Sequence, residues 1–399
     1  MKKAKTHELS KRLLFTVMIL VIYMAGRSLL LYNIDPVAYQ LEELNSQNIM
    51  ISMVSGDRYQ YTVFALGIMP FITSNLIMGI YTAVRGSEFR ARMSPQKTER
   101  YSFFLMMVLA IILALFRAES LMFKESKLNP GMLQAIAVVE MIAGAVIIYK
   151  MANLNKEYGI ASQTPIILVN ILDNLLATIQ SFTWEELSRL LPLSLAMIGI
   201  ILIMENILIK IRVQRVSIHS EYADKSYIAY KADPIGVMPV MFAVTFFMIP
   251  QLIVGLLLLV FEDAKNLQYI YSRIKMTDIV GVAIYLAIIF SLNILFSFIM
   301  LSPGETAEQL QKGGDSIVGI YAGRKTKKYL QKKLLILCIS SGCIFCLLMS
   351  ISLGLSLQGK ISSELALLPA TAMIFTGLLC NLYREVKAYR KFDSYSFFV

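Results

Sequence analysis

The stretch from Ile279 to Leu301 reads IVGVAIYLAIIFSLNILFSFIML and contains no charged residue. A helix needs about 20 mostly apolar residues to cross the hydrocarbon core of a bilayer, so this stretch is long enough. The rest of the chain has the same character, since 57% of its 399 residues are apolar and only 16% are charged. Soluble domains average about 45–50% apolar and about 25% charged residues. The sequence therefore excludes a soluble or disordered chain and predicts an all-α multi-pass membrane protein.

Nine further segments are apolar over a length close to that of a membrane span. In chain order, the ten predicted transmembrane helices are residues 13–32, 62–83, 102–118, 132–151, 159–180, 190–209, 235–261, 279–301, 334–355 and 366–383. The fifth is the least apolar, because it carries Asn170, Asp173 and Asn174. Polar groups in a span are costly and usually face protein or water. This helix therefore either packs inside the bundle or lies beside a water-filled cavity.

The basic residues indicate how the spans are oriented. The chain carries 38 Lys and Arg against 27 Asp and Glu, a net charge of +11. In a soluble protein this excess would suggest nucleic acid, but here it suggests cytoplasmic loops that face anionic lipids. With the N-terminus inside, most basic residues fall in the segments that ten spans place on the inner side. We therefore expect a protein of the cytoplasmic membrane with both termini cytoplasmic and no nucleic-acid partner.

Three segments outside the spans have unusual features. A short apolar patch, residues 49–54, lies in the outer connection 33–61 and is too short to cross a bilayer. It either rests in a loop or at the interface, or folds back into the protein. Two predicted cytoplasmic loops, residues 210–233 and 302–333, are long, polar and basic. Basic loops can serve only as cytoplasmic anchors, but loops of this length are usually functional. We interpret both as a docking surface for a soluble partner.

Common catalytic and metal-binding patterns do not occur in the sequence. There is no G-x-x-x-x-G-K-[ST], no H-E-x-x-H and no G-x-S-x-G. The two histidines, His7 and His219, lie in separate predicted loops, and the four cysteines lie in apolar runs near the C-terminus. We therefore expect a protein that is not an enzyme and has no metal or cofactor.

Four segments resemble the SecY family of protein translocase channels, in the order in which that family has them. TVFALGIMPFITSNLIM (62–78) is similar to the family's F-A-L-G-I-M-P-Y-I, and QKTERY (96–101) to its T-x-Y-x-R-Y. DPIGVMPVMFA (233–243) is similar to N-M-A-G-V-I-P-I-I-F-A, and SPGETAEQLQKGG (302–314) to P-x-E-x-A-E-x-L-K-K-S-G-G. The resemblance runs from about Arg12 to Glu385, nearly the whole chain.

Two departures from the family pattern resemble its accessory branch in some Gram-positive bacteria. The family's G-N-G-I-S is replaced by ASQTP (161–165). Its G-I-R-P-G, with an arginine tied to the motor ATPase, is replaced by GIYAG (319–323), so that Tyr321 stands in place of that arginine and Arg324 follows three residues later. The accessory branch exports serine-rich glycoprotein adhesins with its own motor ATPase. A housekeeping SecY channel is the alternative within the family.

The resemblance implies two pseudo-symmetric halves of five spans, residues 1–182 and 183–399, that close around a pore. It also implies a ring of apolar side chains at the waist, which would gate by dewetting. By position, the ring consists of Ile68, Ile72, Leu168, Met241 and Ile374. The patch within residues 48–56 becomes a plug, formed by Ile49, Met50, Ile51, Ser52, Met53 and Val54.

Two further groups of residues receive roles from the same resemblance. The lateral gate between halves would use Thr73, Ser74, Asn75 and Gln251, because a few interhelical hydrogen bonds can hold a seam and still let it open. The motor ATPase would dock on Lys210, Arg212, Arg215, Tyr321, Arg324, Lys325, Lys327 and Lys328. Small SecE- or SecG-like subunits, or accessory Sec membrane subunits, would complete the complex.

Other classes of membrane protein fit the sequence less well. A secondary transporter or polysaccharide flippase usually places ionisable groups near the bilayer midplane. Here Glu140, Asp173 and Glu205 are the clearest such groups, and they form no evident set. A membrane-embedded glycosyltransferase would need an acidic motif at the membrane face, and none stands out. A purely structural scaffold would leave the long basic loops unexplained.

Overall fold

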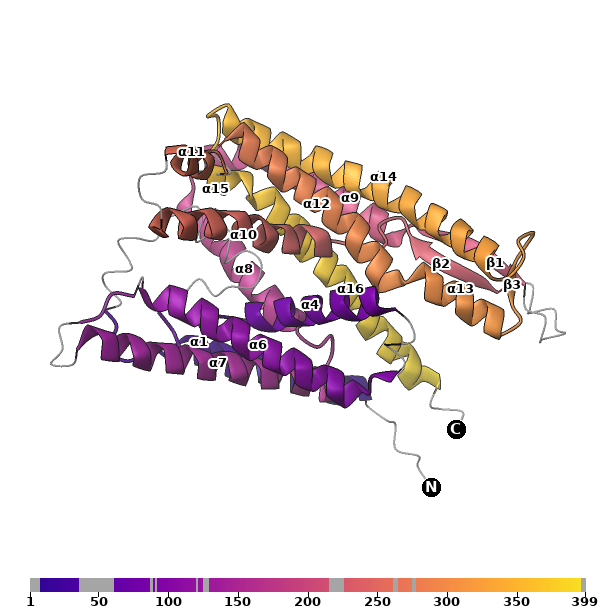
Figure 1. Cartoon of the computed structure of the whole chain (residues 1–399), viewed down its shortest axis with the longest axis horizontal. Coiled ribbons are helices and arrows are strands. Elements are labelled where there is room, and N and C mark those ends of the chain that lie inside the picture. Colours follow the sequence, from indigo (N-terminus) through magenta and orange to yellow (C-terminus); the bar gives the residue numbers. More distant parts are fainter. Residues whose placement is uncertain are drawn as a thin grey trace, which may run out of the picture. The chain divides into compact units, whose positions relative to one another are not determined.

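The computed structural model describes residues 8–35, 61–86, 89, 92–119, 121–124, 129–214, 226–260, 265–274 and 278–395. This part of the chain is mainly helical (Figure 1). The long helices are α1 (Glu8–Arg27), α4 (Met69–Arg85), α6 (Pro95–Glu119), α7 (Pro130–Tyr158), α8 (Thr164–Ser181), α9 (Trp184–Asn206), α10 (Met238–Val260), α12 (Ile279–Leu301), α14 (Arg324–Leu357) and α16 (Leu368–Tyr395). Three short helices are α11 (Lys265–Arg273), α13 (Pro303–Lys312) and α15 (Ser363–Ala366).

Each predicted span overlaps one of the long helices. Among the described residues, six helical runs are long and apolar enough to cross a membrane. They are Glu8–Arg27, Pro95–Ala118, Pro130–Tyr158, Trp184–Asn206, Ile279–Lys312 and Arg324–Leu357. The all-helical membrane class is therefore confirmed, while the count of ten spans stays a prediction.

The second predicted span begins later than expected, because residues 62–68 form turns before α4 starts at Met69. The backbone N–H of Val63 donates to Leu29 O at 2.9 Å, and that of Leu31 donates to Tyr61 O at 3.0 Å. These bonds pair the segment with the chain just after α1. A Cβ atom on Gly144 of α7 would lie 2.0 Å from Val63 O, so only glycine allows this close approach. Tertiary contacts thus override the helical pattern here.

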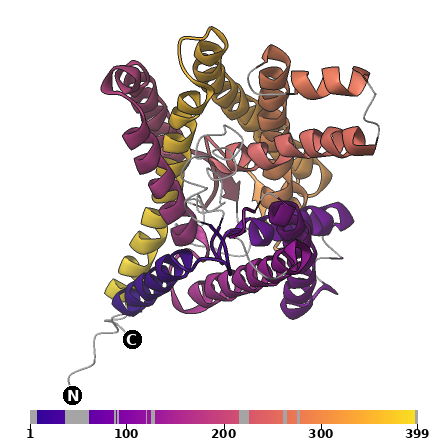
Figure 2. The same ribbon diagram turned by 90° about the vertical axis from the view of Figure 1, so that its left-hand side faces the viewer.

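By their internal contacts, the described elements belong to two compact units. The first unit comprises residues 1–82, 91–179 and 378–399, and the second comprises residues 83–90 and 180–377. In the first unit, α7 contacts both α1 and α6 (Figure 2). In the second unit, α12 contacts α10 and α14, and α13 packs on α14 (Figure 1).

The two regions expected to be loops contain regular structure. Strand β1 (Leu208–Gln214) pairs antiparallel with β2 (Tyr227–Lys231) and with β3 (Ser316–Ile317), giving the order β2-β1-β3. Helix α13 starts at Pro303, where α12 is broken by Ser302 with φ of 38°. Proline suits the first turn of a helix because a backbone N–H, which proline lacks, would have no partner within the helix there. The description of 210–233 and 302–333 as loops was therefore wrong in part.

Candidate channel and docking site

Three of the predicted ring residues lie in the first unit, and all three side chains are buried. The backbone N–H of Ile72 donates to Ile68 O at 3.1 Å, which places the two residues one helical turn apart at the start of α4. Ile68 is fully buried, and Leu168 is a buried residue of α8. Gly67 precedes them with φ of 56°, a conformation that glycine adopts without steric cost. Their membership of a pore ring stays a prediction.

The other two ring residues, Met241 and Ile374, are buried side chains of α10 and α16 in the second unit. A Cβ atom on Gly377 would lie 2.6 Å from the side chain of Val237, just before α10. The backbone N–H of Met241 donates to Val237 O at 3.2 Å. The chains of α10 and α16 therefore approach closely within about one turn of Met241 and Ile374. Whether all five residues form one ring stays a prediction.

The predicted gate residues make hydrogen bonds inside the first unit. Ser102 of α6 donates to the side-chain oxygen of Asn75 at 2.6 Å, and its hydroxyl lies 3.4 Å from that of the buried Ser74. Thr73 is partly exposed on the same helix, α4. The side chain of Gln251 lies outside the described residues, as do all six plug residues. Ser74 and Asn75 of α4 thus have a partner on α6, Ser102, which is not among the predicted gate residues.

Strand β1 presents the first group of predicted docking residues. Burial alternates along it, so that Lys210 and Arg212 are exposed while Ile211 and Val213 are buried. This alternation is the period of a strand with one face on a core. The Nζ atom of Lys210 lies 4.8 Å from the centre of the Tyr227 ring on β2. Arg215 lies outside the described residues.

The second group surrounds the start of α14, where Arg324, Lys325, Lys327 and Lys328 are all exposed. Tyr321 is 79% exposed, and the Nζ atom of Lys325 lies 5.0 Å from its ring centre. The turn that presents Tyr321 is flanked by Gly319 and Gly323, with φ of 78° and 94°. The hydroxyl of Thr326 donates to Tyr321 O at 2.9 Å and fixes the turn on the helix.

One small core joins the two groups. It buries Ile211 and Tyr230 of the hairpin together with Ala307, Ile317 and Leu330 of the second region and Leu337 farther along α14. Strand β3 also pairs with β1 through Val213 and Ile317. The two regions, which are about 100 residues apart in sequence, therefore form one folded body with basic side chains on its outside. We call this body the basic platform, consisting of β1, β2, β3, α13 and the first turns of α14.

A buried charged cluster below the platform was not recognised as a set from the sequence. Glu205, in the last turn of α9, and Asp233, just after β2, have no exposed surface. The Nζ atom of Lys231 lies 2.9 Å from Oε2 of Glu205. Burial raises the pKa of Asp233 to about 7, and repulsion from the Glu205 carboxylate adds to this, while the backbone amides of Ile235 and Gly236 act in the opposite direction. A Cβ atom on Gly236 would lie 2.6 Å from Glu205 Oε1.

The polar residues of the fifth predicted span bind α1. Tyr23 of α1 donates its hydroxyl proton to Asn170 at 2.8 Å, and the buried Arg27 forms an ion pair with Asp173. Asn174 is buried as well. For Asn170 and Asp173, these contacts favour the helix packed inside the bundle over the helix beside a cavity.

Comparisons with known proteins show which family the chain belongs to. The sequence model of the SecY family matches residues 62–380. The accessory Sec system protein translocase subunit SecY2 of Leuconostoc gelidum subsp. gasicomitatum is 22% identical, over 98% of this chain and 97% of that protein. The protein of the same name from Streptococcus salivarius is 24% identical over 99% of both chains.

The fold of the chain is similar to that of solved channel structures. The structure described as that of a protein conducting channel has a TM-score of 0.66 at 15% identity, covering 98% of this chain and 95% of the other. The family match extends over most of the chain, from the turn before α4 into α16. This protein therefore belongs to the SecY family of protein translocation channels.

Proposed function

We propose that this chain is the channel subunit of an accessory Sec translocase, which passes unfolded preproteins across the cytoplasmic membrane. The observation that carries this proposal is the near full-length similarity to accessory SecY2 relatives, combined with Tyr321 in place of the family arginine. The housekeeping channel is the competing assignment within the family.

As a SecY family member, the chain is a multi-pass membrane protein. We propose ten spans with both termini in the cytoplasm, arranged as two halves of five. The ten long helices found among the described residues support this count, and the basic residues on the platform support the orientation. In this topology the platform lies on the cytoplasmic side, because basic loops are retained there.

The pore would be sealed by Ile68, Ile72, Leu168, Met241 and Ile374, with the segment 48–56 as plug. An apolar constriction excludes ions because water leaves it, yet flexible side chains can close around a moving peptide. Met241 fits this role because its unbranched side chain adapts to irregular gaps. Replacing Ile72 and Met241 by glycine should raise ion leak through reconstituted protein several-fold. The control Ile77→Gly changes an exposed residue of the same helix, and an equal leak there would contradict the ring.

The basic platform is the proposed docking site for the motor ATPase. The exposed Lys210, Arg212, Arg324 and Lys325 stand on a body with its own small core, so they present a fixed surface to an acidic partner. Complementary charge would mainly speed the encounter and set the orientation of the two proteins. Tyr321 adds an exposed aromatic ring, a residue type enriched in interface cores.

The proposed clients are serine-rich glycoprotein preproteins, and the proposed partners are the accessory motor ATPase together with small SecE- or SecG-like or accessory Sec membrane subunits. Deletion of the gene, followed by mass spectrometry of secreted and surface proteins, tests the client class. We expect loss of one or a few serine-rich glycoproteins, with other secretion unchanged, and recovery from a plasmid copy. Loss of general secretion would identify the housekeeping channel instead. An unchanged protein profile would reject the translocase proposal.

A further inference from the structure

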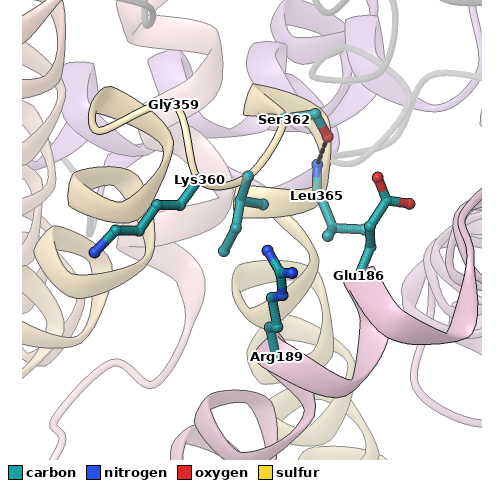
Figure 3. A pocket seen from close by; sticks show the side chains of 7 residues that line it. Glu186, Arg189, Gly359, Lys360, Ser362 and Leu365 are labelled. Atoms are coloured by element: carbon teal, nitrogen blue, oxygen red, sulfur yellow. Dashed lines mark hydrogen bonds between the residues drawn. The ribbon is translucent and has the colours of Figure 1, made fainter.

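A pocket of about 270 Å³ lies in the second unit, between the start of α9 and the connection from α14 to α15 (Figure 3). It is lined by Glu186, Arg189, Gly359, Lys360, Ile361, Ser362 and Leu365. Figure 1 shows that α15 and the sheet lie at opposite ends of α14. The pocket is therefore separate from the basic platform. Its volume is just below the range of about 300–1,000 Å³ typical of drug-sized ligand sites, so it suits a small group.

The charge in this pocket is mainly positive. The Arg189 side chain rises from α9 toward the turn of residues 359–362, with Lys360 to one side and Glu186 to the other (Figure 3). Within the part of the chain that the structure describes, neither Arg189 nor Lys360 has a side-chain hydrogen bond or ion pair. A guanidinium group offers five N–H donors in a planar fork that matches phosphate or carboxylate.

The acidic residue of the pocket is occupied elsewhere. Oε2 of Glu186 accepts hydrogen bonds from the backbone N–H and the hydroxyl of Thr183, at 3.1 and 2.9 Å, and so forms a capping box at the start of α9. Its carboxylate points away from Arg189 (Figure 3). The cap satisfies helix donors that would otherwise lack partners. Glu186 thus has a structural role at the start of α9 and does not form an ion pair with Arg189.

Local structure holds the opposite wall of the pocket in place. Gly359 has φ of +68°, and the backbone N–H of Lys360 donates back to Leu355 O at 3.3 Å, which closes the C-terminus of α14. The Ser362 hydroxyl oxygen accepts from the backbone N–H of Leu365 at 3.3 Å. Its own proton remains available to a bound group. The pocket therefore offers a guanidinium and a hydroxyl, while Lys360 also lines it and directs its ammonium end away from Arg189 (Figure 3).

The neighbouring surface is typical of a membrane interface. Trp184, the only tryptophan of the chain, is 74% exposed at the first residue of α9. Tryptophan is enriched where lipid headgroups meet water. Farther along α9, Leu191 and Leu195 are exposed and continue toward the apolar part of the helix. With 3.6 residues per turn, Trp184, Leu191 and Leu195 fall on the face of α9 opposite to Glu186 and Arg189, so they indicate an interfacial position for the start of α9 but do not line the pocket.

We propose that this pocket binds a phosphate group through Arg189 and Ser362, with Lys360 adding positive charge beside it. Two sources share this chemistry, the headgroup of an anionic phospholipid and free inorganic phosphate. The exposed Trp184 favours the lipid, because it indicates that the start of α9 lies near the membrane interface. Arginine is suited to this position because its stem can lie along apolar surface while its charged end reaches the pocket.

Thermal unfolding of the purified full chain in detergent tests the proposal without requiring transport. Phosphatidylglycerol, phosphatidylcholine and inorganic phosphate are added separately, and a ligand that binds the folded state raises the Tm. A rise with phosphatidylglycerol but not with phosphatidylcholine supports a lipid phosphate site. A rise of similar size with inorganic phosphate supports the site with free phosphate as the ligand. Equal effects of both lipids, or no effect of any additive, overturn the proposal.

Three variants connect the effect to this pocket. With Arg189→Gln, the ligand concentration needed for a given rise in Tm should increase at least ten-fold. With Lys360→Gln, this concentration should increase less. Glu186→Gln should strengthen it, since glutamine keeps the capping box but removes the negative charge. The matched control is Lys124→Gln, which removes an exposed positive charge outside the pocket. If Lys124→Gln weakens the response as much as Arg189→Gln does, general charge attraction explains the binding and the site is rejected.

Discussion

The Nζ atom of Lys231 lies 2.9 Å from Oε2 of Glu205, a carboxylate with no exposed surface. Lys231 is the last residue of β2, and Glu205 lies in the last turn of α9. The ion pair therefore fastens the basic platform to the end of a membrane helix. A buried carboxylate without a counter-charge is costly, because its desolvation is no longer offset.

Replacing Lys231 by methionine should consequently destabilise the protein by about 3 kcal/mol, within the range seen when one partner of a buried pair is removed. Thermal or denaturant unfolding in detergent measures this change. At pH 5, where Asp233 is protonated, the double variant Lys231→Met with Glu205→Gln should recover most of the loss, since no buried charge is then left unpaired. Lys210→Met, which alters an exposed residue of the same hairpin, should have little effect. Equal losses in both single variants would mean that the pair has no special role.

Asp233 should make the stability of the protein dependent on pH. Its pKa is about 7 in the folded chain against 3.8 for an ordinary aspartate, mainly because it is buried and next because Glu205 repels its charge. Between pH 3.8 and about pH 7, Asp233 keeps its proton in the folded state but has lost it in the unfolded state. Stability should therefore fall as pH rises from about 4 to about 7 and change little above that, by at most about 4 kcal/mol.

Asp233→Asn should remove this dependence and raise the Tm at pH 8 more than at pH 5. The comparison variant Glu308→Gln changes an exposed acid on α13 and should leave the pH profile unaltered. A wild-type profile that is flat from pH 4 to 8 would show that Asp233 is ionised at no cost in the folded protein.

The loop between α7 and α8 contains two residues in an unusual backbone conformation. Ala161 and Ser162 have φ of 60° and 47°, where the family has a glycine-containing segment. The Glu385 carboxylate accepts a hydrogen bond from the backbone N–H of Ala161 at 2.9 Å, and Asn155 donates to Ser162 O at 2.6 Å. These bonds hold a conformation that costs roughly 1–2 kcal/mol for a residue with a Cβ atom.

Ala161→Gly should therefore stabilise the protein by roughly 0.5–1 kcal/mol, since relief of strain exceeds the added flexibility of glycine in the unfolded chain. The same exchange inside a helix, Ala177→Gly in α8, should instead destabilise by about 1 kcal/mol. Opposite signs in unfolding measurements would confirm the strain. A loss of stability at both positions would contradict it.

The long apolar helices could be predicted because a bilayer imposes their length and composition, as in Ile279–Leu301. The sheet was missed although β1 alternates polar and apolar residues, LIKIRVQ, because its partner β3 has only two residues and lies about 100 positions away. Glu205 was named only with Glu140 and Asp173, and its cluster with Asp233 was missed because the hairpin between Glu205 and Asp233 brings them together. The ring residues could be named only from the resemblance to the SecY family, because burial alone does not distinguish a pore seal from ordinary packing.

The hydrogen bond from Ser102 to Asn75 refines the expectation for the lateral gate. If Asn75 belongs to a seam that signal sequences open, its partner on α6 fixes its orientation toward that seam. Asn75→Leu and Gln251→Leu should each change the export of weak signal sequences more than that of strong ones. Ser102→Ala should change the export of weak signal sequences in the same direction but less, because it removes the hydrogen bond that orients the Asn75 amide. Export assays with paired weak and strong signals measure this, and an unchanged ratio in all three variants would remove these residues from the gate.

If the basic platform is the docking site for a motor ATPase, as proposed above, binding should depend on the charge of the platform. Arg324 and Lys325 lie at the start of α14, and Lys210 and Arg212 lie on β1. Replacing the residues of either group by glutamate should lower the affinity for the motor about ten-fold or more. The two groups share one small core and one surface, and therefore both changes should act on the same partner. The matched control reverses Arg390 and Lys391, two exposed basic residues of α16 outside the platform. Binding to membrane vesicles at two salt concentrations gives the affinity, and the wild-type advantage should shrink at high salt because the charges are exposed and screened. If the α16 control loses as much affinity as the platform variants, the motor responds to total charge and not to this surface.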